Sequence, residues 1–149
     1  MAEPIAEVAE VVRTAVAPVF LLSGVGVTLT MLTNRLARVV DRARSLESSE
    51  RDTHEQDLHE LQSRLATLAR RARLLGRSIT LCTLCALLVC MVVVTLFVGA
   101  FVNFHLSQVI AVLFVLAMFS FIAGLLLFLR EVFVATRALR IGLRGIRPV

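Results

Sequence analysis

The chain has 149 residues, of which 58% are hydrophobic, and its mean hydropathy is +0.85. An ordinary soluble domain is roughly half apolar, so this composition excludes the soluble globular class and indicates an integral membrane protein. The net charge of +5 is carried by arginines that flank apolar segments and have no aromatic stacking platform beside them. This distribution indicates membrane orientation and contact with anionic lipid headgroups, and it argues against nucleic-acid binding.

Three segments are long and apolar enough to cross a bilayer, which takes about 20 helical residues. They are residues 14–34, 79–102 and 106–129. The second and third segments contain no formally charged side chain, and only Asn103, Phe104 and His105 separate them. This spacing predicts an antiparallel helical hairpin with a very tight turn. The first segment is less hydropathic, and acidic residues precede it, so we expect a retained span rather than a cleaved secretory signal.

The basic residues are distributed asymmetrically along the chain, and all sixteen are arginine. Ten lie between Arg35 and Arg77, five between Arg130 and Arg147, and only Arg13 precedes the first span. Because cytoplasmic loops carry the excess of positive charge, we expect the N-terminus and the 103–105 turn outside, with residues 35–78 and the C-terminus in the cytoplasm.

Apolar residues continue beyond each span in alternating steps of three and four, the spacing of a coiled-coil seam. The three predicted seams are Leu32, Leu36, Val39, Ala43 and Leu46; Leu58, Leu61, Leu65, Leu68, Ala72, Leu75 and Ile79; and Val132, Ala135, Leu139, Gly142 and Ile146. We therefore predict a single all-α membrane domain over residues 1–149, in which three transmembrane helices extend into a cytoplasmic helical bundle. That bundle would consist of a hairpin over 35–78, turning at 47–52 with a cap at Ser49 and Asp52, and a C-terminal helix over 130–147. Three separate, solvated amphipathic helices are the alternative.

The first span has two polar faces beside an apolar one. One polar face is small and hydroxylated, and the other runs from the outer glutamates to the inner arginines. The residues of the first face are Ser23, Gly26, Thr30 and Thr33, and those of the second are Thr14, Leu21, Gly24, Thr28 and Met31. Small residues let helices approach closely in lipid, so both faces can be packing surfaces, one of them against the other two helices. Two such faces exceed what a three-helix monomer needs, which favours a homo-oligomer.

In such an oligomer the second polar face would line a narrow path, with Leu21 and Met31 as apolar constrictions. Pro18 is expected near the start of the helix, where a missing N–H costs least; the alternative is that it kinks the wall of this path.

The string APVFLLSGVGVTLTMLTNRLARVVDRARSL, residues 17–46, is followed by a basic amphipathic helix and a tight two-span hairpin. This arrangement resembles a family of small bacterial membrane proteins known as domain of unknown function 2721. The resemblance extends roughly from residue 11 to 143 and is most specific over NRLARVVDRAR, residues 34–44. It implies a three-helix protein of the bacterial inner membrane and brings no activity, substrate or catalytic residue.

Charged residues gather directly after the first span, where four arginines surround Asp41: Arg35, Arg38, Arg42 and Arg44. The group is explained either as an orientation signal with local helix pairs such as Arg38–Asp41, or as residues that line a cytoplasmic vestibule or hold phospholipid headgroups. In the second interpretation Asp41 fixes one arginine against a neighbouring helix.

No nucleophile constellation, phosphate loop or zinc motif is present, so we expect neither an enzyme nor a cofactor or metal site. Cys82 and Cys85 have redox spacing but lie in an apolar helix, where cysteine behaves as a small hydrophobic residue. The second and third spans lack the charged groups of proton-coupled carriers. Two functions stay open: a homo-oligomeric passive pore or ion channel lined by the first helix, and a membrane scaffold or regulatory protein whose arginine-rich bundle binds lipid or a protein partner.

Overall fold

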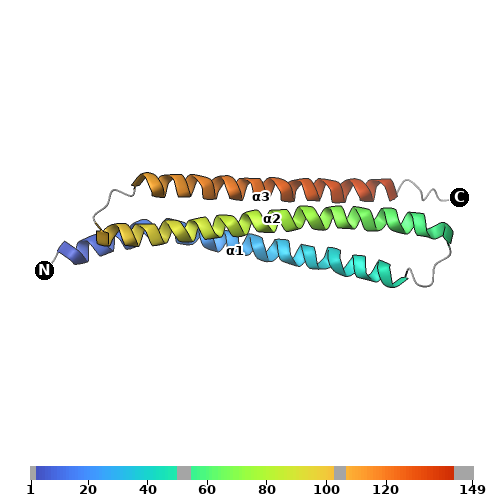
Figure 1. Ribbon diagram of the computed structural model, residues 1–149, viewed down its shortest axis with the longest axis horizontal. Helices are drawn as coiled ribbons and strands as arrows, with labels where there is room; N and C mark the ends of the chain where they lie inside the picture. The colour runs from blue at the N-terminus through green and yellow to red at the C-terminus, as the bar shows by residue number, and fades with distance from the viewer. Residues whose placement is uncertain (1–2, 50–54, 103–106, 143–149) are drawn as a thin grey trace. The chain divides into compact units, whose positions relative to one another are not determined.

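A computed structural model of the protein is all-helical over the residues it describes, which are 3–49, 55–102 and 107–142 (Figure 1). Helix α1 spans Glu3–Ser49, α2 spans Glu55–Val102 and α3 spans Ser107–Gly142. The turn predicted at 47–52 begins later than expected, because α1 continues to Ser49; residues 50–52 and the predicted 103–105 turn lie outside the described residues. Each helix continues without interruption from its apolar run into its arginine-bearing part, as the continuous three-and-four spacing predicts.

All three helices are long and apolar enough to cross a membrane, which confirms the predicted fold class at this level. Their span-forming segments are Val12–Ser48, Gln62–Gly99 and Ser107–Ala135. The protein is therefore a multi-pass membrane protein. Its orientation, and the cytoplasmic position of the helix extensions, stay predictions.

The helices contribute to two compact units. Unit 1 comprises Met1–Thr30 and Thr80–Ala123, and unit 2 comprises Met31–Ile79 and Gly124–Val149. The core of unit 1 is built from small apolar side chains of all three helices: Ala15, Val25, Cys82, Cys85, Val89, Val92 and Ala117. The Ser120 hydroxyl donates a hydrogen bond to the Leu81 carbonyl oxygen at 2.8 Å and so ties α3 to α2. Cys82 and Cys85 are free and buried, consistent with their predicted role as small hydrophobic residues.

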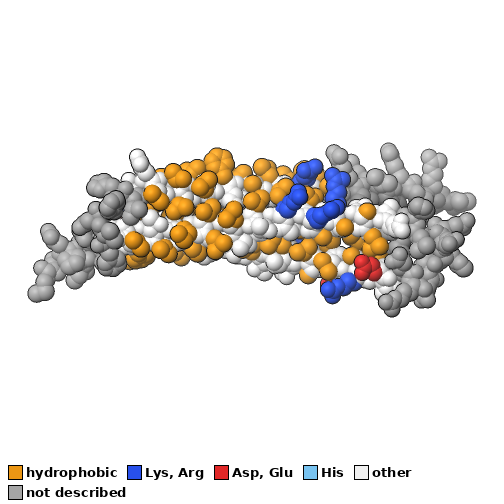
Figure 2. Space-filling view, in the orientation of Figure 1, with side chains coloured by type: hydrophobic (Ala, Val, Ile, Leu, Met, Phe, Trp, Pro, Cys, Tyr) orange, Lys and Arg blue, Asp and Glu red, His pale blue; other side chains and the backbone are white. Residues whose placement is uncertain are grey.

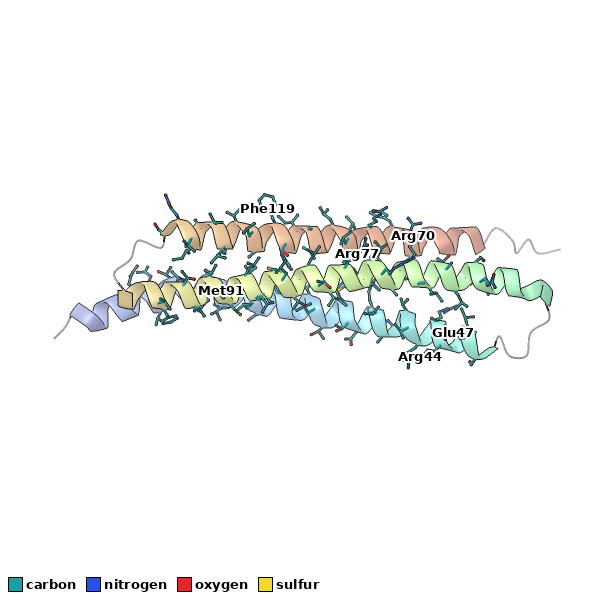
Figure 3. The ribbon with its side chains drawn as sticks, in the orientation of Figure 1. Arg44, Glu47, Arg70, Arg77, Met91 and Phe119 are labelled. Carbon is teal, nitrogen blue, oxygen red and sulfur yellow. The ribbon has the colours of Figure 1, made fainter. Side chains whose placement is uncertain are left out.

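Large hydrophobic side chains cover the outer surface of α2 and α3 in unit 1 (Figure 2). Phe119, for example, is 66% exposed and points away from α2 (Figure 3). Such a surface is incompatible with water and matches the hydrocarbon interior of a bilayer.

Unit 2 has an apolar core to which the predicted seams contribute. Leu32 and Val39 of α1 and Leu68 and Leu75 of α2 are buried, whereas Leu36, Leu65 and Ile79 are half-buried. Leu58, Leu61, Leu139, Gly142 and Ile146 of the predicted seams lie outside the described side chains. Helix α2 also buries Leu74 and Ser78, which are not seam residues, because a second of its faces carries the contacts to α3 described below.

The expected position of Pro18 is wrong. Helix α1 begins at Glu3, so Pro18 lies in the helix interior, where it is buried. Proline there removes the backbone hydrogen bond to the carbonyl four residues earlier. Membrane helices tolerate such residues because side chains and neighbouring helices compensate for the freed backbone group.

Replacing Leu68 with aspartate is expected to destabilise unit 2, because the variant loses buried leucine packing, worth about 2–5 kcal/mol, and places an unpaired carboxylate in the core. Limited trypsin digestion in detergent should then cut faster at Arg64 and Arg70. Thr67→Asp adds the same charge at the neighbouring exposed position and should leave the rate unchanged. Equal digestion of the two variants would contradict the burial of Leu68.

Candidate functional site

Glu131 is a charged residue in the core of unit 2, and its side chain is only 1% exposed. It lies on α3, two residues after the charge-free run that ends at Leu129. A carboxylate removed from water in this way is costly unless positive charge and hydrogen-bond donors surround it. Arginines from the other two helices supply both.

Arg71 of α2 is the stronger partner of this carboxylate. Its Nε and Nη2 atoms donate hydrogen bonds to Glu131 Oε1 at 3.0 and 2.8 Å. The Arg71 side chain is 25% exposed, so the arginine keeps contact with the surroundings while the carboxylate does not. Two charge-assisted hydrogen bonds from one planar guanidinium fix both the distance and the rotation between α2 and α3.

Arg35 of α1 is the weaker partner and contacts α3 at two points. Its Nη1 atom lies 3.4 Å from Glu131 Oε2, and its Cζ atom lies 5.1 Å from the centroid of the Phe128 ring. The second contact is a cation–π interaction with a residue one helical turn before Glu131. The two carboxylate oxygens are therefore divided between α2 and α1, and one acidic side chain joins all three helices.

A hydrogen bond from a serine of α2 to the backbone of α3 keeps the two helices in register beside this cluster. The buried Ser78 hydroxyl donates to the Gly124 carbonyl oxygen at 2.5 Å. Ser78 follows Arg71 by seven residues, and Gly124 precedes Glu131 by seven residues. Seven residues are about two helical turns, so the antiparallel helices meet at matching intervals on the same faces.

The charged residues predicted to form a vestibule lie together. Arg35, Arg38, Asp41 and Arg42 line a groove of about 790 Å³ that Arg71 and Glu131 also line. The interpretation in which Asp41 fixes an arginine against another helix finds no contact in the described part of the chain: Asp41 is exposed, and no hydrogen bond or ion pair joins it to another described residue. Glu131 carries out that role. The overlooked signal is its isolation, because it is the only acidic residue after Glu60.

The polar residues predicted on the first span are exposed or half-buried on unit 1 and the start of unit 2. Thr14, Ser23, Gly24, Gly26, Thr30, Met31 and Thr33 are exposed, and Leu21 and Thr28 are half-buried. A Cβ atom added to Gly24 or to Gly26 would meet no atom within 4 Å. Around Gly24 and Gly26, neither small face is therefore covered by α2 or α3.

The hydroxyls on these faces bond to their own helix. Thr14, Thr28 and Thr30 donate to the carbonyl oxygens four residues earlier at 2.9, 2.9 and 3.0 Å. Ser23 does the same at 3.4 Å. A hydroxyl with an internal partner can face lipid or another helix without leaving an unsatisfied donor.

The chemistry of the Glu131 cluster is electrostatic. Among the described residues, no group of three His, Cys, Asp or Glu side chains could hold a metal ion. The cluster consists of one carboxylate and two guanidiniums that contact it, so its direct effect is to hold helices together at one level.

Comparison with known families gives one match, to the family described as Protein of unknown function (DUF2721), over residues 15–141. The chain belongs to the DUF2721 family. The matched region contains Arg35, Arg71 and Glu131, so the whole ion-pair cluster lies within the DUF2721 domain, and the sequence resemblance is confirmed. Searches of curated proteins and of solved structures give no match.

Arg71→Ala is expected to cost about 3–5 kcal/mol of unfolding free energy, because it leaves a buried carboxylate with one long contact. Arg35→Ala should cost less, about 1–2 kcal/mol, because it removes one weak hydrogen bond and the Phe128 contact. Unfolding by sodium dodecyl sulfate in mixed micelles measures both. Arg73→Ala removes an exposed arginine of the same helix and serves as the control. Equal losses of unfolding free energy in Arg71→Ala and Arg73→Ala would contradict the stabilising role of the Glu131 cluster.

A double variant distinguishes the loss of the Arg71–Glu131 attraction from the cost of leaving the Glu131 carboxylate buried without a partner. If the damage in Arg71→Ala comes from an unpaired buried carboxylate, then adding Glu131→Gln should restore part of the stability.

Proposed function

We propose that the protein functions as a homo-oligomer in the bacterial inner membrane, in which copies of α1 meet and surround a passive path for ions. The observation that carries the proposal is the open space beside Gly24 and Gly26, where an added Cβ atom would meet nothing within 4 Å. Small residues favour association of membrane helices because backbones can approach closely. An uncovered surface of this kind suits a helix from another copy.

The contrast between helices supports α1 as the inner helix. Exposed side chains of α2 and α3 in unit 1 are large, and examples are Leu87, Met91, Phe114 and Phe119. The polar faces of α1 instead expose glycine, serine and threonine, whereas large apolar side chains such as Phe20 and Val27 are exposed elsewhere on this helix. Large apolar side chains fill space against fluid lipid chains, whereas small ones gain most from a closely packed helix. This difference supports an arrangement with α1 inside and the hairpin of α2 and α3 outside.

The path would be lined by the face that carries Thr14, Leu21, Gly24, Thr28 and Met31. Glycine and threonine give a narrow, polar wall, and a ring of Leu21 or Met31 side chains would act as an apolar constriction that gates by dewetting. Charged groups are absent from this face between Thr14 and Met31, so the path suits passive conduction better than coupled transport.

A scaffold that binds lipid or a protein partner is the second candidate. The groove lined by Arg35, Arg38 and Arg42 supports it, since exposed arginines recognise phosphates and carboxylates. Subunit number distinguishes the two functions, because a purified monomer would leave no shared path and would favour the scaffold.

Cysteine crosslinking tests the geometry. Cys82, Cys85 and Cys90 are first replaced by alanine, because Cys90 is exposed and would itself react. Single cysteines at positions 24 and 28 should then link two copies efficiently in membranes. A cysteine at position 115, on the exposed surface of α3, should link poorly. Strong linking at 115 with none on α1 would reject α1 as the inner helix.

Ion flux tests the path itself. Replacing Leu21 or Met31 with serine is expected to raise flux into reconstituted liposomes by about ten-fold, because a polar constriction wets more easily. Gly24→Leu should lower flux by obstructing the path. Val115→Ser makes a similar apolar-to-polar change on α3 and should leave flux unchanged. If the copies crosslink through α1 but the liposomes show no ion flux, the proposed oligomer is supported and the proposed channel is rejected.

A further inference from the structure

A second groove, of about 700 Å³, lies on unit 2 and does not include the Glu131 cluster. It is lined by Arg70 of α2 and by Leu126, Leu129, Arg130, Phe133 and Val134 of α3. Two arginines from two helices are thus set against apolar side chains. None of these six described lining residues is acidic.

The Arg71–Glu131 contact sets the positions of these two arginines. Arg70 directly precedes Arg71, and Arg130 directly precedes Glu131. The two groove arginines are therefore each one residue from the same contact between antiparallel helices, which puts them at nearly the same level.

Neither groove arginine has a charge partner within the described part of the chain. No hydrogen bond or ion pair joins Arg70 or Arg130 to another described residue. The nearby Glu131 carboxylate does not neutralise them, because it is buried and accepts hydrogen bonds from Arg71 and Arg35. The groove consequently has a positive potential that an anion would complement.

The groove also spans the boundary between apolar and charged chain. Leu126 and Leu129 are the exposed end of the charge-free run of α3, and Arg130 follows at once. In Figure 2 arginine side chains gather on unit 2, and in Figure 3 Arg70 and Arg77 are drawn in the space between the ribbons of α2 and α3. Phe133 is 60% exposed beside them. A ligand here meets positive charge at one end and hydrocarbon at the other.

We propose that this groove binds an anionic phospholipid, with the phosphate diester held by the Arg70 and Arg130 guanidiniums and an acyl chain lying along Leu126 and Leu129. Planar guanidiniums match phosphate oxygens in geometry and charge, and basic pockets between membrane helices suit lipid headgroups. A soluble phosphate would use the arginines but not the apolar lining. The site is independent of self-association through α1 and goes beyond the proposed path.

A single tryptophan provides the test, because the natural chain contains neither tryptophan nor tyrosine. The Phe133→Trp protein is reconstituted into phosphatidylcholine liposomes that contain a small fraction of brominated lipid. Brominated phosphatidylglycerol should quench the fluorescence more strongly than brominated phosphatidylcholine. Adding R70A and R130A should lower the apparent affinity for phosphatidylglycerol by about ten-fold, since two charge-assisted contacts are lost.

Three controls define the outcome. R13A/R44A removes the same charge from exposed arginines outside the groove and should keep the preference for phosphatidylglycerol. R70K/R130K keeps the charge without the planar fork and should bind with intermediate affinity. Inorganic phosphate should not displace the brominated lipid. Displacement at millimolar phosphate, or equal loss in R13A/R44A and R70A/R130A, would overturn the proposal.

Native mass spectrometry of proteins without the tryptophan gives a readout that does not depend on Phe133→Trp folding. The unsubstituted protein should retain phosphatidylglycerol in preference to phosphatidylcholine, and R70K/R130K should retain less. Equal retention of phosphatidylglycerol by the two proteins would also overturn the site.

Discussion

The arrangement of unit 2 depends on one buried carboxylate. The Glu131 side chain is 1% exposed, and a buried carboxylate without a partner costs far more than a paired one, so the contacts from Arg71 and Arg35 stabilise this unit. Apolar side chains tolerate small shifts between helices, but two hydrogen bonds of 2.8 and 3.0 Å to one oxygen do not. The ion pair therefore selects one register among the several that leucine and valine alone would accept.

Neighbouring arginines in this protein have different environments for a simple geometric reason. Successive residues on a helix point about 100° apart, so Arg71 faces the Glu131 carboxylate while Arg70 lines the second groove, which also contains Arg130. The same holds on α3, where Glu131 is buried and Arg130 is exposed. The Arg71–Glu131 contact thus compensates two charges and leaves the charges of the adjacent Arg70 and Arg130 available to a ligand. That separation underlies the inference of a lipid site.

The polar character of α1 also has a physical explanation. Its hydroxyls donate to carbonyl oxygens of their own helix, so serine and threonine cost little in an apolar surrounding. Its glycines remove bulk and leave a surface that α2 and α3 do not cover. A span with these small residues packs less favourably against lipid than a leucine-rich span does, but it packs more favourably against another helix. We therefore place the proposed contact between copies on α1.

The sequence by itself determined the features that depend on local composition and period. These are the three long helices, their ability to cross a membrane, the family, and the inward positions of Leu32, Val39, Leu68 and Leu75. Each follows from hydropathy, from the helical repeat or from the string of residues 17–46, and none requires knowledge of a distant residue. The free, buried state of Cys82 and Cys85 follows in the same way, because both lie within an apolar run.

Only the tertiary structure decided which groups meet. The sequence offered Asp41 as one candidate for a fixed acid because four arginines lie near it along the chain, but a residue 96 positions from Arg35 contacts that arginine. It also left open whether the small faces of α1 were covered, and most of their residues are exposed, with Leu21 and Thr28 half-buried. The reason is that the helical period gives only the direction in which each residue points around the axis of its own helix. The rotation and register of one helix against another are set by contacts between residues far apart in the chain.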